Sequence, residues 1–145
     1  MANTKIKGNE VGLYFNNGTT AVPDWVLFAC STSDGFSGST ENVTLASKCD
    51  GGWVDSLPTN LSWEFTNSAY AITDPSATQA SHVKAFDLWS NKTEGQFKLA
   101  NGDDSYLRIG QGYVSSYSET AANEDALQFE LTITGKGAIA NVVPV

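Results

Sequence analysis

The chain has 145 residues, the usual size of one domain, so we expect a single compact unit spanning residues 1–145. Eight Lys and Arg residues against sixteen Asp and Glu residues give a net charge of −8, which argues against a surface that neutralises a nucleic-acid backbone. Ser, Thr and Asn together supply 40 residues, and these short polar types favour strands, turns and caps over helix interiors. The composition therefore argues against an all-helical fold.

The N-terminus indicates the compartment in which the chain folds. It lacks the apolar core of a signal peptide, and no apolar stretch is long enough to span a bilayer. We therefore expect folding in a cytosol and no membrane insertion. The spacing of Cys30 and Cys49 matches no zinc, haem or redox pattern, which favours two free thiols.

The first 60 residues contain one clear strand signal. Residues 1–24 are rich in Gly, Asn and Thr, and they predict an N-terminal arm or an arm ending in a loose hairpin near residues 16–18. Residues 25–30 form a continuous apolar run that predicts a strand buried on both faces, at the centre of the core. Residues 31–60 are polar with turns near 50–52 and 57–60, which indicates a long excursion with little core of its own.

A strand and a helix are predicted next. Apolar residues at 61, 63 and 65 alternate with polar ones, as expected for a strand with one buried face. Asp74 is expected to cap a helix with Pro75 in its first position, ending near Asn91. Val83, Phe86 and Trp89 recur every three residues, with Ala80 on the same side. This spacing predicts that they form the inward stripe of the helix.

The rest of the chain predicts strands around residues 97–99, 106–109 and 113–117, with a turn at 101–104. Residues 127–134 show the clearest alternation of apolar and polar side chains and predict a further strand, which follows an acidic connector at 118–125. Residues 136–145 are expected to form a small-residue C-terminal tail. The tally is about seven strands and one helix, so the predicted fold class is mainly β, a β-sandwich or half-barrel with one flanking α-helix.

Groups for catalysis are sparse in this sequence. His82 is the only histidine, and adjacent Asp103 and Asp104 are first of all hairpin-turn residues. Lys48 beside Cys49 is weak support for a reactive thiol. Phosphate-binding and nucleophile motifs are absent from the sequence. The sequence therefore predicts no enzyme activity, no cofactor and no metal site.

The four tryptophans leave one alternative open. Exposed aromatic rings on a β-sandwich can stack on sugars, as in a secreted carbohydrate-binding module. Trp25, Trp63 and Trp89 are predicted on core faces, whereas Trp53, flanked by Gly51, Gly52 and Asp55, has no core assignment. A single exposed aromatic is more often an interface anchor than a sugar platform.

Three segments carry a resemblance to a known family. They are VLFACSTSDGFSGSTENVTLASKCDGGWVDSLPTNLSWEFT, a helix ending in FDLW, and GQGYVSSYSETAANEDALQFELTITGKG. In their order and spacing over residues 25–137 they resemble the major tail tube protein of long-tailed bacteriophages, a family shared with gene transfer agents. Two features depart from the family pattern: the two cysteines and the high tryptophan content.

The resemblance implies a passive structural role in a virion tail. Six copies would close into a ring whose inner sheets join edge to edge, and rings would stack into a tube around the tape measure protein. The implied further partners are the tail terminator and distal tail proteins. Assembly would take place in the host bacterial cytoplasm. Six copies at −8 carry −48 per ring, so double-stranded DNA would pass through the tube without sticking.

Two sets of residues are candidates for assembly surfaces. The polar faces of the two clearest strands are expected to line the lumen: Ser62, Glu64, Thr66, Gln128, Glu130, Thr132 and Thr134. The 31–60 excursion and the first ten residues are expected to make the contact between rings through Trp53, Asp55, Phe36, Lys5 and Lys7.

Overall fold

The computed structural model describes residues 5–19, 21–45, 51–53, 55–102, 106–123 and 125–141. Its strands are β1 (Gly12–Asn16), β2 (Trp25–Phe28), β3 (Ser31–Leu45), β4 (Asp55–Tyr70), β5 (Gln79–Ala80), β6 (Glu94–Ala100), β7 (Leu107–Thr120) and β8 (Gln128–Ala140). A short 3-10 turn, η1 (Gly8–Glu10), precedes β1, and one helix, α1 (His82–Ser90), precedes β6. The mainly β fold class is confirmed, with eight strands in these described residues where the sequence predicted about seven.

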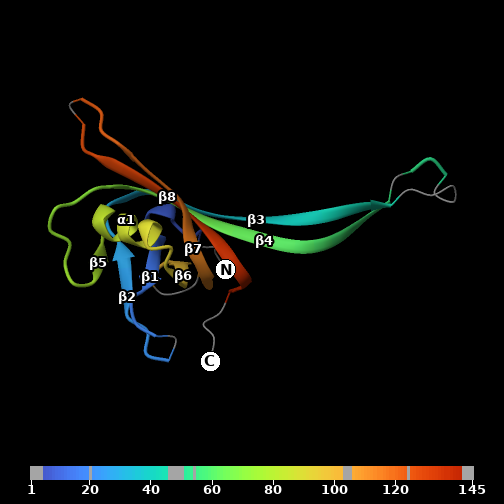
Figure 1. Cartoon of the computed structure of the whole chain (residues 1–145), viewed down its shortest axis with the longest axis horizontal. Helices are drawn as coiled ribbons and strands as arrows, with labels where there is room; N and C mark the ends of the chain where they lie inside the picture. The colour runs from blue at the N-terminus through green and yellow to red at the C-terminus, as the bar shows by residue number, and fades with distance from the viewer. Residues whose placement is uncertain are drawn as a thin grey trace.

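All eight strands belong to one sheet with the order β3-β4-β8-β7-β6-β1-β2-β5. The pairs are antiparallel except β2 with β5, which run parallel. The sheet curls, because β3 also contacts β1 and β6 although several strands separate them in the order. It therefore forms a half-barrel around one core, and α1 lies across one side of it (Figure 1).

The core lies on the concave face of this sheet. Alternation along each strand sends every second apolar side chain inward, and aromatic rings fill the centre. The Phe15 and Phe97 ring centroids lie 5.0 Å apart, and those of Trp63 and Phe65 lie 4.9 Å apart. The largest fully buried apolar side chains of this core are Phe28, Phe65, Phe97, Phe129, Leu13, Leu99, Leu131 and Ile133, whereas Ile109 is buried with Ala100 and Leu107 in a smaller cluster on the opposite face.

The predicted strand at residues 25–30 is not the centre of the core. β2 lies next to the two-residue edge strand β5, so only one of its faces is fully covered. Val26 and Phe28 are buried, while Trp25 and Leu27 are partly exposed. In contrast, β1 lies inside the sheet between β2 and β6, and Leu13 is fully buried. Residues 12–16 thus belong to a core hairpin rather than to a free arm.

The helix differs from its predicted start and orientation. It begins at His82 after the extended Ser81, because residues 79–80 pair with β2 and residue 75 lies in the preceding loop. The side chains that face the sheet are Ala85 and Leu88. The predicted inward stripe is wrong: Val83, Phe86 and Trp89 are 62%, 48% and 43% exposed. The small Ala85 lets the helix approach β7 closely, and the bulky residues point outward.

The long polar segment at 31–60 is regular structure rather than an irregular loop. β3 pairs with β4 from Ser31 opposite Ala69 out to Leu45 opposite Asp55. The two strands leave the body together as a long hairpin, which we call the arm (Figure 1).

Likewise, the two strands predicted near residues 106–109 and 113–117 are one continuous strand, β7. Its partner β8 continues to Ala140, into the segment predicted as a tail.

Candidate assembly surfaces

The outer part of the arm has almost no core of its own. Beyond Trp63 every described residue of β4 towards the tip is exposed, as is every residue of β3 from Ser37 outward. Leu61 was predicted on the buried face, but it is 82% exposed because it lies past the edge of the body. An isolated two-stranded hairpin is marginally stable in water. The arm therefore carries surface that is suited to packing against another chain.

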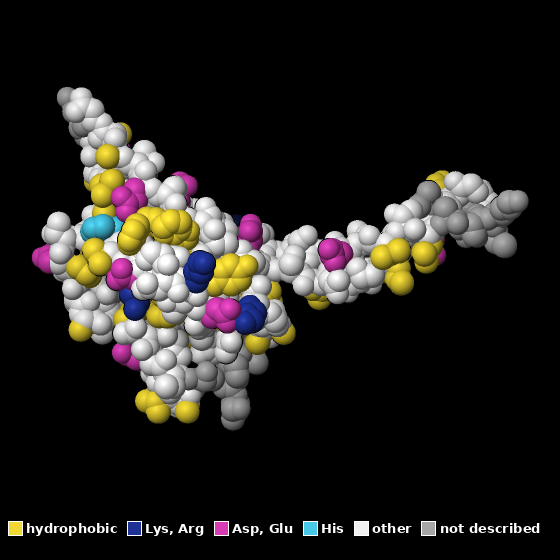
Figure 2. Space-filling view, viewed as in Figure 1, with side chains coloured by type: hydrophobic (Ala, Val, Ile, Leu, Met, Phe, Trp, Pro, Cys, Tyr) yellow, Lys and Arg dark blue, Asp and Glu magenta, His cyan; other side chains and the backbone are white. Residues whose placement is uncertain are grey.

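Exposed apolar side chains follow the arm towards its tip. A register shift lies between Thr40 and Asn42, and beyond it Val43 stands directly opposite Leu57. Figure 2 shows hydrophobic side chains along the arm. Trp53 is 83% exposed at the tip, with exposed Asp55 at the start of β4. Among the described residues of the arm, the exposed large apolar ones are Val43, Leu45, Trp53, Leu57 and Leu61.

The other residues expected to contact a second ring have different surroundings. Lys5 and Lys7 are exposed next to η1. Phe36 is half-buried at the root of the arm, where its ring lies 5.7 Å from that of Phe65 and 5.9 Å from the Arg108 guanidinium carbon. Phe36 thus packs on the edge of the core rather than projecting from the arm.

The convex face of the sheet is polar where β4 and β8 pair. Register places Glu64 opposite Thr134, Thr66 opposite Thr132, and Ser68 opposite Glu130. These side chains point away from the core residues that alternate with them, such as Phe65 and Ile133. We call this surface the polar face. Six of the seven residues predicted to line a lumen lie within this paired region, and Ser62 continues the face along β4: Ser62, Glu64, Thr66, Gln128, Glu130, Thr132 and Thr134.

One basic residue lies at the margin of the polar face. Lys136 follows Thr134 by two positions on β8, and its Nζ lies 2.7 Å from Glu94 Oε2. Both side chains are more than half exposed, so the pair is screened by solvent and stabilises the fold little. The pairing nevertheless keeps this cation beside an anion. The sequence reasoning missed it because the two residues are 42 positions apart.

An apolar cleft of about 520 Å³ lies at the root of the arm. Trp63 forms part of its wall and donates a hydrogen bond from Nε1 to the Gly137 carbonyl oxygen, at 2.9 Å. A Cβ atom at Gly135 would lie 2.1 Å from the Trp63 ring, so this glycine is what allows the indole to lie flat on β8. The lining residues are Phe36, Gly38, Ser39, Thr40, Leu61, Ser62, Trp63, Gly135, Gly137, Ala138 and Ile139.

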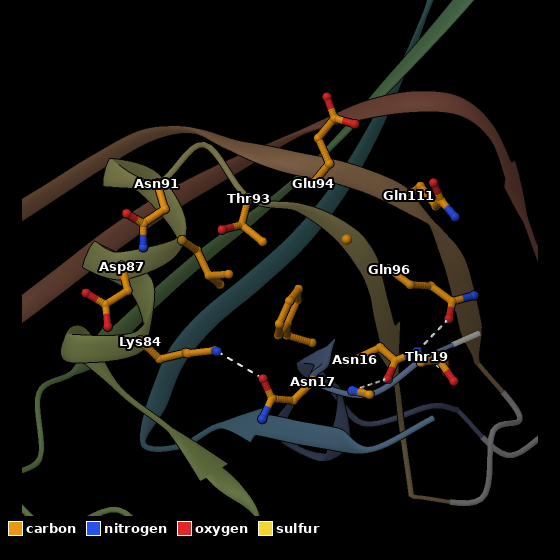
Figure 3. Close-up of a pocket in the computed structure, with 14 residues that line it drawn as sticks. Asn16, Asn17, Thr19, Lys84, Asp87, Asn91, Thr93, Glu94, Gln96 and Gln111 are labelled. Atoms are coloured by element: carbon orange, nitrogen blue, oxygen red, sulfur yellow. Dashed lines mark hydrogen bonds between the residues drawn. The ribbon is translucent and has the colours of Figure 1, made fainter. Parts of the chain in front are cut away.

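A second, polar cleft of about 650 Å³ lies between the β1–β2 turn, α1 and β6. Figure 3 shows Lys84 reaching from the helix to Asn17, with Nζ donating to Oδ1 at 3.0 Å. Asn16 is buried, and its Nδ2 donates to the Gln96 side chain and to the Thr19 carbonyl oxygen, both at 3.1 Å. These amide contacts hold the turn against β6. They serve structure rather than forming a set of catalytic groups.

The Asp34 and Tyr117 side chains have raised pKa values. Burial raises the pKa of the Asp34 carboxyl, while hydrogen bonds from Asn67 and Ser31 oppose the shift. Burial, reinforced by a hydrogen bond to Glu119 and its charge, raises the pKa of Tyr117. The Asp34 contact joins β3 to β4, and the Tyr117 ring lies 6.3 Å from the Phe129 ring of β8. Among the described residues no three His, Cys, Asp or Glu side chains gather as a metal site, and no helix is long and apolar enough to cross a membrane.

The architecture itself indicates a class of protein. A half-barrel whose long hairpin exposes large apolar side chains, and whose convex face is polar over β4 and β8, is a building block that completes its packing with other chains. Exposed apolar surface of this extent is typical of interaction sites. The fold thus indicates a structural assembly subunit.

The chain belongs to the phage tail tube protein family, whose sequence model matches residues 5–141. It is a structural tail tube protein of a virion, as the resemblance implied, and nothing in the comparisons supports the carbohydrate-binding alternative. A comparison with curated proteins finds no match.

Solved structures share the fold at low sequence identity. A chain of the native gene transfer agent virion superposes with a TM-score of 0.74 at 14% identity, covering 94% of this chain and 98% of that one. A chain of the empty gene transfer agent tail, refined with C6 symmetry, gives 0.75 at 16% identity with the same two coverages. The SPP1 tail tube chain gives 0.71 at 16% identity, covering 92% of this chain and 77% of that one.

Proposed function

We propose that six copies of this chain close into a ring, and that stacked rings form the tube through which double-stranded DNA leaves the particle. The observation that carries the proposal is the polar face of β4 and β8, which lies on the side of the sheet opposite the core. The sheet is open, and its two edge strands are β3 and β5. The similar gene transfer agent tail has C6 symmetry, which supports the number six. Joining the sheets of neighbouring copies would also remove exposed strand edges.

The polar face would form the wall of the lumen. Its seven candidate residues comprise two acids, Glu64 and Glu130, and five uncharged polar side chains. A wall without unpaired cations repels a phosphate backbone and does not retain it. DNA would pass with no covalent chemistry, so the protein needs no cofactor and has no turnover as an enzyme. The same lumen would enclose the tape measure protein during assembly.

The arm would make the contact between stacked rings. Trp53 is its most exposed aromatic residue, and aromatic anchors commonly dominate interface energetics. Asp55 follows it two residues later, and Lys5 and Lys7 of the N-terminal segment would assist. The half-buried Phe36 would act by shaping the root of the arm. The ends of the tube would meet the tail terminator and distal tail proteins, with assembly in the host bacterial cytoplasm.

The test is the state of assembly of the purified full-length chain. Size-exclusion chromatography with light scattering, followed by negative-stain electron microscopy, should give hexameric rings or tubes as concentration rises. Class averages should show six-fold symmetry and a central channel. A monomer at every concentration, or closed rings of another number, would contradict the proposal.

A further inference from the structure

The apolar cleft at the root of the arm is open and bears no charged residue among its lining side chains. Phe36, Trp63 and Ile139 form apolar walls, and Gly38 leaves part of one wall without a side chain. A Cβ atom built on Gly38 would meet only ordinary contacts, the nearest being the Ser62 carbonyl oxygen at 3.8 Å. The cleft therefore has room for a large apolar side chain. The neighbouring Gly135 already accommodates the Trp63 indole in the same way.

A matching side chain lies at the other end of the arm. Trp53 is 83% exposed, and it is flanked by Gly52 and followed two residues later by exposed Asp55. Such a large apolar group gains considerably from burial in a preformed pocket. Trp53 lies at the tip of a narrow hairpin, so its side chain can enter a cleft of about 520 Å³.

The occupant must come from a second copy. Leu61 at the cleft lies eight positions after Trp53, and extended strand covers about 3.3 Å per residue, so roughly 26 Å lie between tip and root. The paired strands β3 and β4 hold the arm extended, which prevents the tip from returning to its own cleft. Tip and root are different surfaces, so their contact repeats from copy to copy in a head-to-tail manner.

Charge complementarity also favours contact between the arm tip of one copy and the cleft of another. Asp55 accompanies Trp53 at the tip, whereas Arg108 lies beside the cleft with its guanidinium carbon 5.9 Å from the Phe36 ring. A docked tip would bring an acid towards a base at the edge of an apolar contact. Complementary charges at the margin orient a hydrophobic anchor and speed its association.

We propose that the cleft between β3, β4 and β8 receives the Trp53 side chain of a second copy of this chain, in an adjoining ring. This inference rests on the proposed tube and assigns the surface that receives the arm. Each subunit would insert its own Trp53 into the cleft of one copy and receive the Trp53 of another in its own cleft. A ring would therefore present six arm tips on one side and six clefts on the other.

The first experiment fills the cleft from within. Gly38→Leu should place a side chain in the cleft without strain, and Gly102→Leu adds the same side chain where no heavy atom lies within 4 Å. We expect Gly38→Leu and Trp53→Ala to keep the monomer fold, measured by circular dichroism and thermal unfolding. Both should raise the concentration at which tubes form on the order of tenfold to a hundredfold. Gly102→Leu should assemble like the wild-type protein.

The second experiment detects the contact directly. In a background with Cys30→Ser and Cys49→Ser, one population carries Asp55→Cys and another carries Ser39→Cys, which lies at the cleft. Mixed tubes treated with a short bifunctional thiol reagent should give a cross-linked dimer only when both populations are present. Asp55→Cys mixed with Ser118→Cys, on the distant β7–β8 hairpin, is the control and should give none.

The possible results separate the two proposals. Normal tube formation by Gly38→Leu and Trp53→Ala would overturn the inference and leave the tube itself intact. An effect of Gly38→Leu without one of Trp53→Ala would mean that another segment fills the cleft, which also overturns it. Failure of the wild-type protein to form rings under all conditions would instead refute the proposed function.

Discussion

Reversing the two charges of the polar face tests whether this surface lines the lumen. Glu64 and Glu130 are both exposed, and from the described residues Glu64 accepts a single long hydrogen bond, from Ser37 Oγ at 3.3 Å. Their replacement by lysine should therefore leave the fold intact. Register places Ser68 opposite Glu130, so the two carboxylates stand four strand positions apart, about 13 Å.

The expected magnitude follows from charge and screening. Each Glu→Lys change shifts the charge by two units, so two sites in six copies shift a ring by +24, from −48 to −24. At 0.15 M salt the Debye length is about 8 Å, so the two sites act separately. At 0.01 M salt it is about 30 Å, and the lysines of a ring act together. Each phosphate contact steepens the plot of log binding constant against log salt concentration by about 0.9 in slope.

The assay uses assembled tubes and a short DNA duplex. Tubes of the Glu64→Lys, Glu130→Lys variant should retain duplex at low salt and release it as salt rises, measured by co-sedimentation. Glu64→Gln with Glu130→Gln removes the charges without reversing them and should retain less. Asp74→Lys with Asp87→Lys applies the same charge change near α1 and should retain none inside. Equal retention by the last variant, or no retention by the first in normal tubes, would refute the assignment of the wall.

Three further changes test the fold. Gly135→Ala should destabilise the chain by about 1–3 kcal/mol in urea unfolding, because the new Cβ would lie 2.1 Å from the Trp63 ring; wild-type stability would mean that the indole is not held there. Phe65→Ala removes a fully buried ring and should cost about 3–5 kcal/mol by the same measurement; a loss below 1 kcal/mol would contradict its place in the core. The raised pKa of Tyr117 means that the folded chain keeps a proton the unfolded chain loses, so its contribution reduces stability as pH rises above about 10. Ultraviolet titration should show that Tyr117 ionises above the ordinary tyrosine pKa, and Glu119→Gln should lower the pKa of Tyr117; ionisation of Tyr117 at the ordinary tyrosine pKa would exclude the contact.

The alternating strands were predictable because their pattern is local. Phe129, Leu131 and Ile133 alternate with polar residues, and this period of two by itself assigns one face to the core and the other to the polar face. The same reasoning identified Trp53 as exposed, since Gly51 and Gly52 beside it form a turn. Sequence order and spacing also carried the correct family, which the family model confirms.

The helix shows where local pattern is insufficient. Two stripes satisfy helical spacing, one through Phe86 and one through Ala85 and Leu88, and hydrophobicity favours the bulkier stripe. The structure buries the smaller one, because α1 lies close to β7 and only Ala85 fits at the contact. Asp74 and Pro75 form a valid capping signal, but pairing of β5 with β2 takes the chain past it before the helix begins.

The β fold class, the polar face and the exposed position of Trp53 follow from local sequence patterns, because each depends on residues that are neighbours along one strand or turn. Tertiary structure decided that residues 31–45 and 55–70 form a paired arm and that Leu61 is exposed. It also decided that β3, the middle of β4 and the end of β8 line one apolar cleft. These features depend on which distant strands pair and on where a strand leaves the body, and long-range packing energy sets both, not local periodicity.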